Sequence, residues 1–215
     1  MMDMADNYLE RRFEEVFGQG GGKKALPARP SLDRLVLRNR SYRGYDRNYE
    51  VHIRQLRAII DINTRVASSV NMQSLRFHPV TKGPEADLVN SHIRMGRALP
   101  ELHLPFPGTE PEAFIVVCCN REENASVDID LGISLQTMLL KAVELGLGGL
   151  IIRNFDREEI RNGLSLPLEP VAVVAIGKPA EKIELVPVRS TDSLKYYRKD
   201  GVHYVPKIIA EDLYV

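Results

Sequence analysis

A run of seven apolar residues, from Ala113 to Cys119, constrains the fold of this chain more than any other segment of its sequence. It is far shorter than the roughly 20 residues that a helix needs to cross a bilayer. A continuous run of this length, rich in β-branched side chains, is typical of a buried strand. A similar run from Val171 to Gly177 predicts a second buried strand. We therefore expect a sheet at the centre of a globular domain.

Helical patterns alternate with these strands. We expect helices at 31–38, 50–66, 85–99 and 156–164, one from about 128 to 145, and further strands at 76–81 and 149–153. Asp128 or Asp130 is predicted to cap the long helix, and Gly146 to end it. This alternation indicates an α/β-layered or α+β domain. The tail from 195 to 215 has no clear period.

The first 30 residues have the composition of an arm rather than of a domain. We expect a short helix from Tyr8 to Phe17 and a linker that begins with three glycines at 20–22, followed by a domain over 31–215. The glycine run is not a phosphate-binding loop. Such a loop needs glycine where Phe17 stands, and Ser or Thr where Lys24 stands.

Composition excludes several classes of protein. The 215 residues carry 29 basic and 29 acidic side chains, so no net charge attracts nucleic acid or an anionic membrane. The start of the chain lacks the apolar core of a secretory signal. The two cysteines, Cys118 and Cys119, are adjacent inside an apolar run, which favours a reducing compartment and a packing role. We expect a soluble cytoplasmic protein, without a metal, because no Cys or His cluster has ligand spacing.

Three segments contain side chains suited to binding. Arg38, Arg40, Ser41 and Arg43 lie within six residues, and guanidinium groups pair well with phosphate oxygens. A second segment, 67–77, is rich in Ser, Asn and Gln, which can hydrogen-bond the edge of a heterocycle. The third places Arg153 and Asn154 at the end of a predicted strand. Taken singly, the first segment is more typical of a solvated basic turn, the second of a polar loop with capping residues, and the glycines before the third of close packing.

Together, in order and spacing, the segments resemble motifs of the FMN-dependent nitroreductase family. The family pattern R-R-S-x-R-x-F appears here as residues 39–45, and P-S-x-x-N-x-Q-P-W-x-F as residues 67–77. Its later G-L-G and F-D signature appears at 146–156, followed by G-x-P-A-E at 177–181. Three departures affect the site: Asn39 replaces the first arginine of the pattern, Ser74-Leu75 replaces Pro-Trp, and Arg153-Asn154 replaces a strand-end pair that is often Gly-Gly or Glu-Gly.

The resemblance implies an α+β fold with a central, mostly antiparallel sheet flanked by helices. It also implies an intertwined homodimer with FMN at the interface. Near the C-terminus, Lys207 matches a basic residue that meets the phosphate, with Arg198 and Lys195 as alternatives. The implied cofactor-binding positions are Asn39, Arg40, Ser41, Arg43, Ser68, Ser69, Val70, Asn71, Gln73, Arg153, Asn154 and Lys207. Among these, Arg40, Ser41 and Arg43 would hold the phosphate and pyrimidine edge, while Ser68 to Gln73 would flank the ring or come from the partner subunit. Arg153 and Asn154 would contact the ring near its reactive nitrogen.

The implied activity is transfer of a hydride from NAD(P)H, as co-substrate, through bound FMN to a nitroaromatic, a quinone or a similar flat acceptor in a ping-pong cycle. No protein acid or base is required, because the cofactor performs the redox chemistry. We therefore assign no catalytic residue. Two alternatives stay open: a protein that binds FMN without turnover, and specialised flavin chemistry on the same fold, such as flavin fragmentation or reductive dehalogenation.

Overall fold

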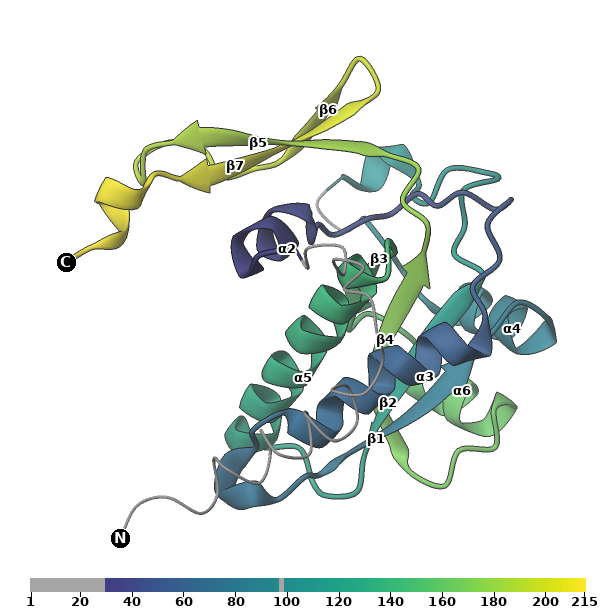
Figure 1. Ribbon diagram of the computed structural model, residues 1–215. Helices are drawn as coiled ribbons and strands as arrows, with labels where there is room; N and C mark the ends of the chain where they lie inside the picture. Colours follow the sequence, from purple (N-terminus) through teal and green to yellow (C-terminus); the bar gives the residue numbers. More distant parts are fainter. Residues whose placement is uncertain (1–29, 97–98) are drawn as a thin grey trace, which may run out of the picture. The chain divides into compact units, whose positions relative to one another are not determined.

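Four antiparallel strands form the central sheet, in the order β1 (Leu75–Val80), β2 (Ala113–Cys119), β4 (Glu169–Gly177) and β3 (Gly148–Ile152) (Figure 1). The computed structural model describes residues 30–96 and 99–215, and residues 32–215 belong to one unit. The strands lie within two residues of their predicted positions, and the predicted α+β class is confirmed. The helix and glycine linker predicted before residue 30 lie outside the described residues.

The position of β2 between two layers of helices explains why its sequence is apolar throughout. Its alternate residues Ile115 and Val117 pack in one cluster with α3 (Ile53–Asp61) and α5 (Ala125–Glu144). Phe114 and Val116 point to the opposite face, toward α4 (Pro84–His92) and α6 (Arg157–Gly163). Because helices cover both faces, every position of the strand is buried. The two cysteines are free and buried in this strand, as predicted, and burial raises the pKa of the Cys118 thiol to about 11.

The helices follow the predicted order, with one error in capping. Asn124 is the N-cap of α5, because its side chain accepts the backbone N–H groups of Ser126 and Val127. The prediction of Asp128 or Asp130 as the cap is therefore wrong. Gly146 follows the helix with φ of +76°, as its predicted role at the end requires. Within the described residues, no helix combines the length and the apolar character needed to cross a bilayer.

Helix α4 ends at His92, seven residues before the predicted end at residue 99. The chain leaves the helix because its backbone pairs with residues that follow β3. The N–H of Arg94 donates to the carbonyl oxygen of Asn154 at 2.9 Å, and the N–H of Asp156 donates to that of His92 at 2.9 Å. Helix α3 is likewise shorter than predicted, since a 3-10 turn, η1 (Ile62–Arg65), continues it.

A second sheet forms from residues 182–208, a part of the chain for which no strand was predicted and whose tail, from 195 onward, has no clear period. Strand β7 (Val202–Ile208) lies between β5 (Lys182–Val188), to which it is parallel, and β6 (Tyr197–Lys199), to which it is antiparallel. Figure 1 shows this sheet beyond the end of β4, with the short η4 (Ala210–Leu213) near the C-terminus. Helix α2 (Leu32–Arg38) packs against α5 and, with Leu185 and Lys207 of the second sheet, lines a shallow cavity.

Candidate functional site

A cavity of about 300 Å³ lies where α2, the segment that follows it, α5 and the second sheet meet. Five residues of the predicted site line it: Asn39, Arg40, Ser41, Arg43 and Lys207. The remaining lining residues were not predicted as site residues, and they are Val36, Gln136, Ile183, Tyr196, His203 and Val205. The structure thus brings the basic turn and the C-terminal lysine together, although more than 160 residues separate them in the sequence.

Strand β7 contributes one of its faces to this cavity. His203, Val205 and Lys207 alternate along the strand, so their side chains share a face, and all three line the cavity. Of the basic residues considered for the phosphate, Lys207 lines the cavity whereas Arg198 forms an ion pair with Glu181. Lys195 is exposed and is not among the lining residues. The alternating pattern would have indicated His203 if the strand itself had been recognised.

Two arginines that line the cavity have buried hydrogen-bond donors that lack an acceptor. Arg40 donates one N–H to the carbonyl oxygen of Val36 at 2.5 Å, and Arg43 donates one to that of Ser41 at 3.0 Å. The Nε atoms of both arginines are buried and have no partner among the described residues. Burial lowers the pKa of Arg40, but a guanidinium stays protonated at neutral pH. The unpartnered N–H groups of these two guanidinium groups, together with Lys207, make the cavity suitable for an anion.

The segment that carries these arginines is held by its backbone. The N–H of Tyr42 donates to the carbonyl oxygen of Gly149 at 3.2 Å, and the N–H of Ala180 donates to that of Gly44 at 3.1 Å. Gly148 allows the close approach, because a Cβ atom there would lie 2.5 Å from the ring of Tyr42. The ends of β3 and β4 therefore fix the position of Arg40 to Gly44.

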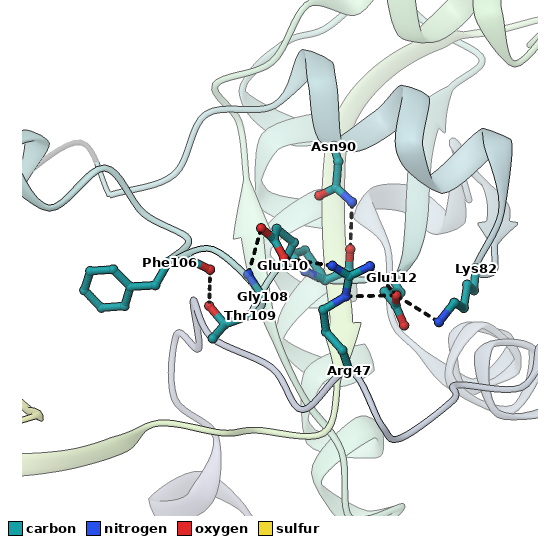
Figure 2. A network of polar contacts seen from close by, with 9 residues as sticks. Arg47, Lys82, Asn90, Phe106, Gly108, Thr109, Glu110 and Glu112 are labelled. Carbon is teal, nitrogen blue, oxygen red and sulfur yellow. Dashed lines mark hydrogen bonds and ion pairs between the residues drawn. The ribbon is translucent and has the colours of Figure 1, made fainter.

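A polar network holds the part of the chain that follows this segment, beginning at Arg47 (Figure 2). Arg47 contacts Glu112 at 2.7 Å and Glu110 at 3.2 Å, and Lys82 contacts Glu112 at 3.1 Å. Asn90 of α4 donates to the carbonyl oxygen of Pro111 at 2.7 Å. Partial burial alone raises the pKa of Glu112, but hydrogen bonds from Arg47 and Lys82 outweigh it, so that the pKa is lowered. The network ties the loop before β2 to α4 and to Arg47.

The second predicted group, Ser68, Ser69, Val70, Asn71 and Gln73, lies elsewhere, around the short helix η2 (Ser69–Asn71). Val70, Asn71 and Gln73 have φ of +42°, +56° and +48°, which is costly for residues other than glycine. The carboxylate of Asp130 accepts the backbone N–H of Ser69 at 2.8 Å, and the hydroxyl of Ser68 accepts that of Gln73 at 3.1 Å. These bonds hold the segment in its strained conformation.

Helix α5 separates this group from the cavity that contains Arg40. Asp130 and Ser134 are one turn apart on a buried face, where they line a second cavity of about 230 Å³ together with Ser68 and Gln73. Gln136, which lines the first cavity, lies about 120° around the helix from Asp130 and about 160° from Ser134. One chain therefore does not bring the Ser68–Gln73 segment to the cavity of Arg40 and Arg43.

The third predicted pair also lies outside the first cavity. Arg153 forms ion pairs with Asp128 at 3.1 Å and Glu123 at 3.3 Å, and Glu123 also pairs with Arg157. Asn154 lines a third cavity, of about 700 Å³, with residues of α4 and of the loop before β2. Across residues 30–96 and 99–215, no three or more His, Cys, Asp or Glu side chains gather where a metal ion could be held.

Residues 36–178 match the sequence profile described as the Nitroreductase family. The chain belongs to the nitroreductase family. The matched range contains every predicted site position from Asn39 to Asn154, and it ends before the second sheet, so His203 and Lys207 lie outside it. A search of curated proteins finds no match.

Solved structures share the fold of this nitroreductase-family chain at low sequence identity. One, a nitroreductase family protein from Clostridium novyi NT, is 23% identical with a TM-score of 0.57, over 70% of this chain and 87% of that one. A protein from Desulfovibrio desulfuricans in complex with FMN is 22% identical, with a TM-score of 0.57, over 72% and 89% of the two chains. An FMN- and NADPH-dependent nitroreductase from a strain of Sphigopyxis is 18% identical, with a TM-score of 0.60, over 70% and 89%.

Proposed function

We propose that this member of the nitroreductase family is an FMN-dependent oxidoreductase that uses NAD(P)H to reduce a nitroaromatic, a quinone or a similar flat acceptor. The observation that carries the proposal is the cavity of about 300 Å³ lined by Arg40, Arg43 and Lys207, because both arginines have a buried, unpartnered N–H group. Such a cavity favours a ligand with several acceptor oxygens, as the phosphate of FMN has. Solved relatives of the same fold include one in complex with FMN and one that depends on FMN and NADPH.

The residues present fit this cofactor. Arg40, Arg43, Ser41 and Lys207 would hold its phosphate, and Asn39, which donates to Gln136 at 3.2 Å, would lie beside it. When bound, FMN supplies the hydride chemistry, and the protein binds it, orients it and offsets charge. A fixed guanidinium beside the pyrimidine edge stabilises negative charge there. A ping-pong cycle follows if both substrates use the same open face of the flavin.

We further propose a homodimer with the flavin at the interface. Ile129 and Ile133 of α5 are 62% and 41% exposed, and with Gln136 they lie on one side of the helix, which leads to the cavity. Leu32 and Leu37 of α2 are also exposed. Exposed apolar side chains along neighbouring helices are typical of an interface. A partner on this face would complete the site with its own Ser68–Gln73 segment, which the single chain holds away from the cavity.

A second candidate function is FMN binding without turnover. Arg153 supports it, because its guanidinium is engaged by two carboxylates and is therefore not free to offset charge on a reduced ring. The free thiols of Cys118 and Cys119 support a reducing, cytoplasmic compartment for either function.

Absorption spectroscopy of the purified protein tests these proposals. We expect a yellow protein with about one FMN per chain, bleached by NADH or NADPH without oxygen and restored by menadione or a nitroaromatic. A colourless protein that cannot be reconstituted with FMN would contradict both functions, and a bound flavin that NAD(P)H does not bleach would favour the second. Arg43→Ala should lower FMN occupancy, whereas Arg65→Ala, an exposed arginine of η1, should leave it unchanged.

A further inference from the structure

His203 is a buried polar residue on the wall of the cavity. It lies in β7 with 1% of its surface exposed, and it faces the same way as Val205 and Lys207. Its neighbour in register on β5 is Ile183, which also lines the cavity, and its neighbour on β6 is Arg198. The two flanking strands thus hold its backbone on both sides, and Arg43 lies close enough for its charge to act on the imidazole.

The imidazole lacks a partner for its Nδ1 atom. This nitrogen is buried and forms no hydrogen bond to the described residues. The ring packs against Tyr196, with 5.0 Å between ring centres, and the guanidinium of Arg43 lies 5.3 Å from the centre of the same tyrosine ring. The nearby carboxylate, Glu181, is engaged by Arg198 and by backbone N–H groups. A buried ring nitrogen without a partner costs free energy unless a ligand or water meets it.

The surroundings keep this histidine uncharged at neutral pH. Burial, together with the positive charges of Arg43 and Arg198, lowers the pKa of His203 to about 4. The other charged side chain on the cavity face of β7 is Lys207, and α2 and the following segment add Arg40. A neutral imidazole has one N–H donor and one acceptor nitrogen. His203 can therefore donate a directed hydrogen bond without adding to the repulsion among these cations.

We propose that His203 is a ligand-binding residue of this cavity, whose ring N–H donates to a phosphate oxygen held by Arg40, Arg43 and Lys207. The inference rests on the proposed function for the identity of the phosphate as that of FMN. A phosphate is favoured over the flavin ring because three cationic side chains line the same cavity as the histidine. The phosphate oxygens would then accept hydrogen bonds from the arginine and imidazole N–H groups, so that these buried donors have partners.

Comparison of FMN with riboflavin, which lacks the phosphate, tests the assignment. His203→Phe keeps a ring against Tyr196 but removes both nitrogens, and His203→Gln restores an uncharged N–H donor. By fluorescence titration we expect the phenylalanine variant to bind FMN about tenfold more weakly, as loss of a hydrogen bond to a charged group predicts, and riboflavin less than twofold more weakly. The glutamine variant should recover most of the loss. Tyr204→Phe, a neighbour on the opposite face of β7, serves as the matched control.

Two results would overturn the inference: unchanged FMN affinity of His203→Phe, or equal weakening of FMN and riboflavin. If that variant fails to fold, NMR of the wild-type imidazole nitrogens decides, with inorganic phosphate as the probe. Phosphate should shift the His203 resonances, and their failure to shift would also overturn the inference. A protein that binds phosphate at His203 but not FMN would contradict the proposed function while leaving this assignment in place.

Discussion

The carboxylate of Glu181 connects the arginine-bearing segment to the second sheet. One of its oxygens forms an ion pair with Arg198 of β6, and the other accepts the backbone N–H of Arg43. The same oxygen accepts the N–H of Gly44 at 3.3 Å. Glu181 therefore positions the arginine-bearing segment relative to the second sheet. The family motif G-x-P-A-E ends at this glutamate, and the structure gives the physical reason for an acid at that place.

Replacing Glu181 with glutamine should destabilise the protein and weaken FMN binding together. The amide keeps an acceptor for the backbone but removes the charge that pairs with Arg198, whose side chain is largely buried. We expect a loss of about 2 kcal/mol in the free energy of unfolding, measured by urea denaturation. Glu184→Gln, which disrupts an exposed pair with Lys182 on β5, should change it by less than about 0.5 kcal/mol. Equal effects of the two variants would show that Glu181 has no special positioning role.

Asp130 should control the strained Ser68–Gln73 segment. Its side chain is buried and accepts the backbone N–H of Ser69. Asp130→Ala removes this acceptor, although the residues after Ser69 still have to adopt positive φ. We expect a loss of about 2 kcal/mol in stability and faster amide hydrogen exchange at Ser69, while Asp130→Asn should retain most of the protection. Asp128→Ala, on the exposed side of the same helix, is the control. Unchanged exchange at Ser69 in Asp130→Ala would contradict this role.

The strands and helices of the central layers could be predicted because their signals are local. The run from Ala113 to Cys119 is apolar at every position since both faces are covered, and Gly146 ends α5 through its own backbone conformation. The cap of α5 could not be predicted in the same way. Asp130 has a side chain suited to capping, but the fold turns that side chain inward to Ser69.

The second sheet and half of the cavity escaped prediction for a different reason. Strands β5 and β7 are only partly buried, each contains a proline, and they pair in parallel with β6 between them in the sequence. Their pattern therefore shows neither a continuous apolar run nor a clean alternation. Arg40 and Arg43 could be predicted as site residues because they form a compact motif. His203 can be assigned to the cavity only once the face of its strand is known.

The buried histidine predicts how stability depends on pH. In the folded protein the pKa of His203 is about 4, against 6.5 for an ordinary histidine, so between these values the unfolded chain binds a proton that the folded chain does not. Stability is therefore fully present above pH 6.5 and is lost as the pH falls toward 4, by about 3 kcal/mol at most. Thermal unfolding of FMN-free wild type and FMN-free His203→Gln across this range measures the effect. The variant should show a flatter profile, and identical slopes would exclude His203 as the cause.

The exposed isoleucines of α5 give the test of the proposed dimer. Ile129 and Ile133 lie one turn apart on the side of the helix that leads to Gln136 and the cavity. Ile129→Asp combined with Ile133→Asp should place charge in the apolar interface, so that sedimentation shows a monomer and FMN is no longer retained. Ile53→Asp is the matched control, because this 40% exposed residue begins α3, where an acid is tolerated. A double variant that remains dimeric with flavin bound would place the interface elsewhere. A monomer that keeps its flavin would show instead that one chain suffices for the site.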